Sequence, residues 1–221
     1  MPDRAHWDEV YATRASDSLS WYQQGGGLSL DWIRQLNLPS SAGIIDVGGG
    51  TSRLVDELLA AGYDDLTVLD LSRQALEASR SRLGDAGGKV SWLAQDITEV
   101  DLPAARFDLW HDRAVFHFLT EPSHRQAYVE RLRRSLRPGG RVIMATFAPT
   151  GPERCSGLPV MRYGPESLHA ALGEDLRLVR HASEQHATPA GAVQLFNFCL
   201  FELPRQPWPE GPAGRAGSLC H

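Results

Sequence analysis

Three acidic residues follow short apolar segments of the chain, in a pattern suited to binding a nucleoside. Asp46 precedes the run Gly48-Gly49-Gly50-Thr51, and Asp70 and Asp96 follow the next two apolar segments. Glycines directly after a strand allow a tight turn and let a ligand approach the backbone. A carboxylate about twenty residues further on can accept hydrogen bonds from the two hydroxyls of a ribose. The spacing therefore predicts that Asp70 binds a ribose and that Asp96 accepts from an adenine amino group.

The charge of Asp46 indicates which adenine nucleoside would bind. A dinucleotide fingerprint reads G-x-G-x-x-G, but counted from Gly48 the position of its third glycine is occupied by Arg53. A carboxylate beside a pyrophosphate would be repulsive by on the order of 1 kcal/mol. The same carboxylate would attract a ligand that carries an ammonium and a sulfonium. The sequence thus favours S-adenosylmethionine (SAM), with an NAD(P)-dependent oxidoreductase and a binding module without activity as alternatives.

The elements that must position these residues alternate between strand and helix. Short apolar runs predict strands at 43–47, 66–69, 90–93, 107–110 and 141–147. Apolar residues at helical spacing predict helices at 51–61, 72–83 and 122–136. A loop at 149–163, a helix at 165–172 and a hairpin of strands 176–184 and 192–203 complete the chain. This order predicts an α/β fold, a Rossmann-like, doubly wound sheet in three αβα layers.

Four segments resemble the motifs of class I SAM-dependent methyltransferases. Ile44–Ser52 is similar to their glycine motif and Val68–Ser72 to their ribose motif, while Ala94–Ile97 and Leu136–Gly140 match two later motifs. The resemblance extends over about Trp7 to Leu203 and implies a seven-stranded, mostly parallel sheet with an antiparallel last strand. The cofactor-binding residues that it implies are Asp46, Gly48, Gly49, Gly50, Thr51, Asp70, Leu71, Asp96, Ile97, His111, Tyr11 and Trp21.

The residues that follow the fourth strand are the candidates for catalysis. Methyl transfer is a displacement at carbon, so the protein must mainly align the reactants and sometimes remove a proton. His117 is a candidate general base because an imidazole titrates near neutrality, although a buried structural histidine fits the sequence equally well. His111 and Asp112 are further candidates, and Asp112 could instead orient Arg113 or cap the following turn.

Four residues are predicted to contact the acceptor. Arg113 follows the fourth strand, and Cys155 and Arg162 lie in the loop 149–163, which should overlook the same cleft. Arg162 could hold a carboxylate through two hydrogen bonds, and Cys155 could line the acceptor pocket or be a small buried hydrophobic residue. Tyr22 belongs to an aromatic N-terminal segment that, in this family, often covers the cofactor.

The acceptor class is narrowed by motifs that are missing. The Asn/Asp-Pro-Pro-Tyr motif of adenine-N6 and glutamine methyltransferases and the Pro-Cys pair of cytosine-C5 enzymes are absent. Residues 112–116 partly match the Asp-Lys-Gly-Thr-Phe of protein-lysine methyltransferases. A small-molecule acceptor is therefore expected, with a protein lysine as the alternative. The acceptor atom, the use of a base and the choice between monomer and homodimer stay open.

Composition excludes several other classes of protein. The chain has 221 residues, 42% of them hydrophobic, and a net charge of −5, which disfavours nucleic acid as a partner. No apolar run is long enough to span a membrane, the histidines show no metal-ligand spacing, and three scattered cysteines do not form a disulfide framework. We expect a cytoplasmic protein with one domain at 1–203, a covering segment at 1–40 and a disordered tail at 204–221.

Overall fold

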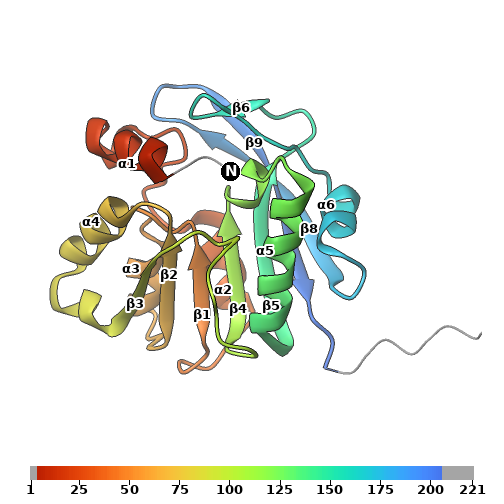
Figure 1. Cartoon of the computed structure of the whole chain (residues 1–221). Coiled ribbons are helices and arrows are strands. Elements are labelled where there is room, and N and C mark those ends of the chain that lie inside the picture. Colours follow the sequence, from red (N-terminus) through yellow and green to blue (C-terminus); the bar gives the residue numbers. More distant parts are fainter. Residues whose placement is uncertain (1–3, 206–221) are drawn as a thin grey trace, which may run out of the picture.

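The computed structural model describes residues 4–205, which form a seven-stranded sheet with helices on both faces (Figure 1). The strands lie in the order β3-β2-β1-β4-β5-β9-β8. Their bounds are β1 Ile44–Val47, β2 Leu66–Asp70, β3 Val90–Ala94, β4 Phe107–Arg113, β5 Leu136–Phe147, β8 Arg177–Ala187 and β9 Val193–Glu202. The first five strands pair in parallel, while β9 is antiparallel to both β5 and β8. The predicted Rossmann-like fold is confirmed.

The helices connect the parallel strands and add an N-terminal layer. They are α1 Arg4–Thr13, α2 Gly27–Gln35, α3 Leu54–Ala60, α4 Arg73–Leu83, α5 Pro122–Ser135 and α6 Pro165–Leu172. Short 3-10 turns are η1 Ser16–Ser18, η2 Gly84–Lys89 and η3 Phe116–Phe118. Ser72 caps α4 as expected, because its Oγ accepts a hydrogen bond from the Ala75 N–H at 3.3 Å. Pro122 begins α5, where a missing N–H has no cost.

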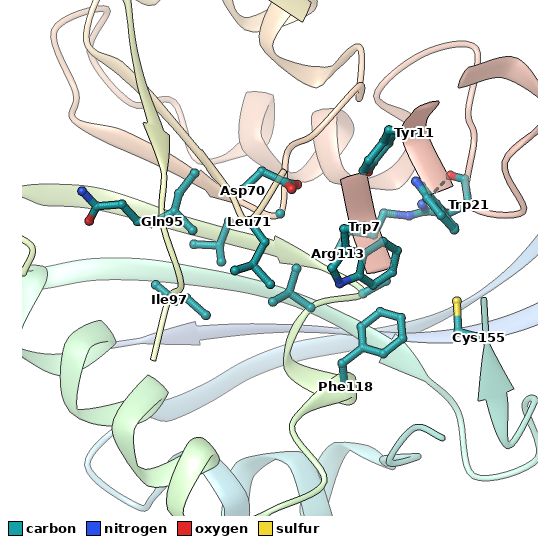
Figure 2. A pocket seen from close by; sticks show the side chains of 15 residues that line it. Trp7, Tyr11, Trp21, Asp70, Leu71, Gln95, Ile97, Arg113, Phe118 and Cys155 are labelled. Atoms are coloured by element: carbon teal, nitrogen blue, oxygen red, sulfur yellow. Dashed lines mark hydrogen bonds between the residues drawn. The ribbon is translucent and has the colours of Figure 1, made fainter. Parts of the chain in front are cut away.

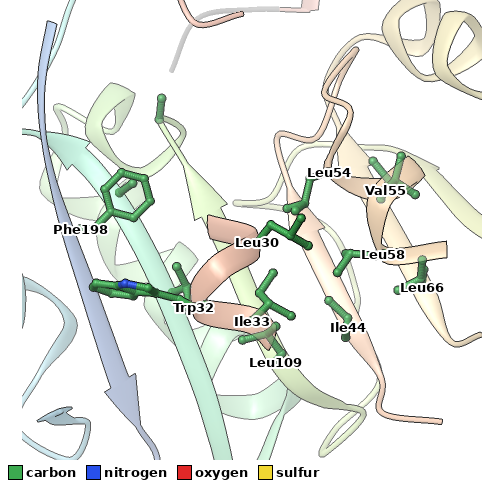
Figure 3. Close-up of a cluster of buried hydrophobic side chains, with 14 of the residues drawn as sticks. Leu30, Trp32, Ile33, Ile44, Leu54, Val55, Leu58, Leu66, Leu109 and Phe198 are labelled. Carbon is green, nitrogen blue, oxygen red and sulfur yellow. The ribbon is translucent and has the colours of Figure 1, made fainter. Parts of the chain in front are cut away.

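The core consists of two hydrophobic clusters, one on each face of the sheet. Neighbouring residues Ile44 and Ile45 of β1 are both fully buried but belong to different clusters. On one face, α2 and α3 pack over β1, β2 and β4, as seen around Leu30, Ile33 and Leu58 (Figure 3). On the other face lie α5 and α6. Because successive strand side chains point to opposite faces, both faces need a covering layer, and the three-layer arrangement follows.

Several element boundaries differ from the sequence predictions. Strand β4 continues to Arg113, so that three of the candidate site residues lie within the strand. Strand β5 begins at Leu136, which pairs with Phe107 of β4, and the segment expected to be a turn is held by a hydrogen bond from Gly139 N–H to Leu203 O at 2.7 Å, just after β9. Helix α2 was not predicted, and the predicted loop contains a small hairpin, β6 Arg154–Cys155 with β7 Leu158–Pro159.

Helix α1 lies over the carboxyl ends of the strands, above α4 (Figure 1). Arg4 Nη2 donates to Ala94 O at 3.1 Å, and Ser72 Oγ donates to Asp8 Oδ1 at 2.5 Å. These bonds tie the N-terminal segment to β3 and to the start of α4. All but the first two residues of the predicted tail lie outside the described residues. Within residues 4–205, no helix is long and apolar enough to cross a membrane.

Candidate functional site

Two adjoining cavities lie at the carboxyl ends of the parallel strands, where open α/β sheets bind ligands. The larger encloses about 650 Å³ and has mostly apolar walls, and we call it the apolar cavity (Figure 2). The smaller, of about 580 Å³, is lined by Ser29, Asp46 and His111 among others, and we call it the polar cavity. Trp21, Gly48 and Arg113 line both, so the two cavities adjoin at these residues.

One end of the apolar cavity carries the ribose-type acid. Asp70, Leu71, Gln95 and Ile97 lie together there (Figure 2). The Ser72 N–H donates to Asp70 Oδ1 at 2.8 Å and fixes the carboxyl group. Burial, helped by the nearby carboxylates of Asp46 and Asp8, raises the pKa of Asp70 to about 7 against the backbone hydrogen bonds, which lower it.

The other end of the apolar cavity is walled by aromatic rings. Trp7 lies edge-on to Trp21 and to Phe118, with ring centroids 5.8 and 5.2 Å apart. Tyr11 approaches Trp21 at 6.2 Å, and Cys155 completes this end (Figure 2). The N-terminal segment thus supplies one wall and the turn after β4 supplies the other.

The glycine turn separates the two cavities and is held closely to the sheet. Gly48 N–H donates to Leu69 O at 2.7 Å, and Gly49 N–H donates to the same oxygen at 3.2 Å. Gly50 O accepts from Ser79 Oγ of α4 at 2.7 Å. Gly48 has φ +72°, and a Cβ there would lie 2.0 Å from Val115 Cγ2, so no other residue fits.

A hydrogen-bonded chain of three buried side chains lines the polar cavity. Asp46 Oδ1 lies 2.7 Å from His111 Nδ1, and His111 Nε2 lies 2.8 Å from Ser29 Oγ. The second carboxylate oxygen of Asp46, Oδ2, is buried without a hydrogen-bond partner among the described residues. The chain fixes the Asp46 side chain and leaves one oxygen unpaired. Thr51, Gly49 and Tyr22 line the same cavity.

Asp112 points to the opposite face of β4 from its two neighbours. Alternation along the strand places His111 and Arg113 at the cavities and Asp112 against α5. Its Oδ2 accepts from Tyr128 Oη at 2.6 Å, and its Oδ1 accepts from the Val115 N–H at 2.9 Å. Burial raises its pKa to about 6 against these bonds. Asp112 therefore lines neither cavity and caps the following turn, the alternative that the sequence had left open.

His117 is also removed from both cavities. The side chain is fully buried between Phe118 and Phe147, and neither ring nitrogen has a hydrogen-bond partner within residues 4–205. Burial, and then the charge of Arg113, lower its pKa to about 3. A neutral, weakly basic imidazole behind the cavity wall is poorly suited to be a general base.

Arg113 is a nearly buried cation where the two cavities meet. Its Nη1 donates to Trp21 O at 2.9 Å, and its guanidinium lies 4.6 Å from the ring centre of Phe196. Nη2 is 3.8 Å from Glu184 Oε2, too far for a hydrogen bond, and Nε and Nη2 have no hydrogen-bond partner among the described residues. Burial lowers the pKa of Arg113 to about 10, so it remains charged at neutral pH.

Other predicted residues are dispersed. Asp96 Oδ1 accepts from the Thr98 N–H and from Thr98 Oγ1, both at 2.7 Å, and Asp96 lines neither cavity. Arg162 is exposed and pairs with Glu153 at 3.0 Å. Gln95, beside Asp96, lines the cavity instead.

Three further lining residues, Ser29, Val115 and Phe118, escaped the sequence reasoning. Ser29 belongs to the unpredicted helix α2, and a glycine run followed by apolar spacing was the one signal that could have revealed it.

Comparison with known proteins identifies the family. The profile of a family described as "Methyltransferase domain" matches residues 44–140, from β1 to the start of β5. A 1,6-didemethyltoxoflavin-N1-methyltransferase from Burkholderia thailandensis, solved with bound S-adenosylhomocysteine, has the same fold. Its TM-score is 0.61 at 21% identity, and the match covers 91% of this chain and 84% of that one. Residues 44–140 thus match the methyltransferase family, and the chain has the fold of SAM-dependent methyltransferases.

Curated relatives of this methyltransferase family differ in what their names say they modify. The eEF1A lysine and N-terminal methyltransferase of Mus musculus is 26% identical over 149 residues, 65% of this chain and 21% of that protein. The ubiquinone/menaquinone biosynthesis C-methyltransferase of Syntrophotalea carbinolica is 28% identical over 195 residues, 76% of this chain and 80% of that protein. The chain spans 21%, 19% and 52% of the first three relatives.

The residues present fit S-adenosylmethionine, the methyl donor of the family. The unpaired oxygen of Asp46 suits an ammonium group, and the buried carboxyl of Asp70 suits a pair of hydroxyls. The glycine turn between them lets a ligand lie against the backbone. No group of three or more potential metal ligands occurs within residues 4–205.

Proposed function

We propose that this protein transfers a methyl group from S-adenosylmethionine to a small-molecule acceptor. When bound, the cofactor supplies a methyl carbon activated by a sulfonium. Asp70 would hold the ribose, with Leu71, Gln95 and Ile97 beside the adenine, and Asp46 would hold the ammonium in the polar cavity. The single domain would span 1–203, with residues 1–40 as its cover.

The observation that carries the small-molecule proposal is the aromatic end of the apolar cavity, walled by the N-terminal segment and by the turn after β4. Trp7, Trp21 and Phe118 meet there edge-to-face, and α1 is tied across the strand ends through Arg4 and Asp8. A folded protein could present a lysine only through an open channel, whereas a compact ligand can be enclosed. Aromatic faces beside a sulfonium would also contribute about 0.5–2 kcal/mol of cation–π attraction.

A protein lysine is the second candidate, supported by the relatives that are named as eEF1A lysine methyltransferases. The acceptor segment departs from their Asp-Lys-Gly-Thr-Phe motif, since this chain has Asp112-Arg113-Ala114-Val115-Phe116. The relative that covers most of both chains is instead named for quinone biosynthesis.

Two measurements test the proposal. Calorimetry should show binding of S-adenosylhomocysteine and none of NADH, because Asp46 would repel a pyrophosphate. Incubation of a lysate with methyl-labelled S-adenosylmethionine should place the label in the small-molecule fraction. Label confined to protein would favour the lysine alternative, and binding of NADH alone would overturn the methyltransferase assignment.

A further inference from the structure

Arg113 stands out because it is a cation held out of water with unused hydrogen-bond donors. Its side chain is 11% exposed, and Nε and Nη2 have no hydrogen-bond partner among the described residues. Buried donors without partners are unfavourable, so an acceptor of hydrogen bonds that reached them would stabilise the site. A planar guanidinium pairs best with a carboxylate or another delocalised anion.

The groups around Arg113 do not satisfy it. Glu184, the nearest carboxylate, lies 3.8 Å away and accepts a long hydrogen bond from Gln23 at 3.4 Å. Burial, and then the charge of Arg113, lower the pKa values of both His117 and His186, so these two neighbours are neutral at pH 7. The positive charge is therefore incompletely balanced by the protein.

The apolar cavity also lacks a base that could activate a neutral acceptor. The titratable side chains lining it within residues 4–205 are Tyr11, Asp70, Arg113 and Cys155. Burial raises the pKa of Cys155 to about 11 and that of Tyr11 well above 10, so both stay protonated at neutral pH. Asp70 lies at the opposite end of the cavity from Cys155 (Figure 2). An acceptor that needed deprotonation would find no group to take its proton.

We propose that the acceptor is a small planar acid that binds already ionised, with its negative charge on the Arg113 guanidinium and its ring between Trp7, Trp21 and Phe118. This inference rests on the methyltransferase function proposed above. It disfavours a lysine acceptor, because an ammonium must lose a proton before it reacts and is repelled by a buried guanidinium.

The chemistry balances without a base. A lone pair on the oxygen or sulfur of the anion forms the bond to the methyl carbon as the carbon–sulfur bond breaks, and that bond's electron pair stays on sulfur. The sulfonium becomes a neutral thioether, the acceptor becomes a neutral ester, ether or thioether, and no proton moves. Neutralisation of the acceptor removes its attraction to Arg113 and favours release of the product.

The test measures binding of matched acids and amides to the protein loaded with S-adenosylhomocysteine. The probes are 2-naphthoate and 2-naphthamide, followed by quenching of tryptophan fluorescence, since Trp7 and Trp21 line the cavity. The wild type should prefer the acid about tenfold or more. Arg113→Gln should abolish the preference, and Arg113→Lys, which keeps the charge, should retain part of it. Arg154→Gln, a change of an exposed arginine beside Cys155, is the control and should bind like the wild type.

The outcomes separate this inference from the proposed function. Equal binding of acid and amide by the wild type, with S-adenosylhomocysteine still bound, overturns the inference alone. Failure to bind S-adenosylhomocysteine overturns the methyltransferase proposal. If Arg113→Gln weakens S-adenosylhomocysteine tenfold and leaves the acid preference intact, Arg113 binds the carboxylate of the cofactor and the inference is wrong. A circular dichroism spectrum checks that each variant is folded. If Arg113→Gln does not fold, the comparison of acid and amide binding is made with Arg113→Lys instead.

Discussion

The carboxyl group of Asp70 should make the stability of the ligand-free protein depend on pH, and Asp70→Asn isolates the effect. Burial raises its folded pKa to about 7 from 3.8 in the unfolded chain. Between these values the folded state binds more protons than the unfolded state. The free energy of unfolding therefore falls as pH rises through this window and becomes level above it. Asparagine does not titrate, and its side-chain oxygen can still accept from the Ser72 N–H.

The size of the effect follows from the width of the window. Each pH unit well inside the window contributes about 1.4 kcal/mol, and the slope is halved at the folded pKa, so Asp70 should lower the free energy of unfolding by about 2 kcal/mol between pH 5 and pH 7. Asp112, whose pKa is raised to about 6, titrates in both proteins and cancels from their difference. The variant should thus gain stability relative to the wild type as pH increases.

The assay is urea unfolding of wild type and Asp70→Asn at pH 5, 6, 7 and 8, without ligand. Asp31→Asn, which removes one carboxylate from the exposed face of α2, is the control and should parallel the wild type. Calorimetry should show S-adenosylhomocysteine bound about tenfold more weakly by Asp70→Asn, the scale of a lost charge-assisted hydrogen bond. A difference in stability that is the same at pH 5 and pH 8 would refute the argument from burial, and unchanged affinity would mean that the ribose binds elsewhere.

Three further changes test backbone strain, packing and hydrogen bonding. Gly62→Ala adds a Cβ at φ +90° with no atom within 4 Å and should cost about 1 kcal/mol from backbone strain alone. Gly48→Ala adds a clash with Val115 and should lower the free energy of unfolding by about 1–3 kcal/mol more than Gly62→Ala does. A second substitution in the same chain, Val115→Ala, should restore part of that stability. Equal losses of stability for the two glycine variants in urea unfolding would contradict this. Tyr128→Phe removes one hydrogen bond to the buried Asp112 carboxylate, which keeps its backbone partners, and leaves the Trp110 indole N–H unpaired. The free energy of unfolding should fall by about 1–3 kcal/mol, with a higher pKa for Asp112 by NMR titration. A variant as stable as the wild type would show that water replaces the lost hydroxyl.

Local sequence patterns were sufficient for most of the sheet. Apolar runs separated by helical spacing identified all five parallel strands, and the turn before β9 gave the antiparallel pair. Helix α2 was missed because its glycine-rich start resembles a loop and its apolar face becomes apparent only when Leu30 and Ile33 pack on the sheet. The start of β5 was missed because its pairing partner, Phe107 of β4, is distant in the sequence and the Pro-Gly-Gly segment resembles a turn.

The sequence by itself determined the backbone of the cofactor site. Gly48 and Asp70 follow buried strands directly, and parallel strands bring their carboxyl ends to one edge. Tertiary structure decided which polar side chains reach that edge. Arg113 faces the cavities and Asp112 faces α5 because of the side to which β4 turns each residue, and aromatic packing encloses His117. The aromatic end of the apolar cavity joins Trp7, Phe118 and Cys155 from three distant segments, and only their packing together creates a cavity with a buried cation.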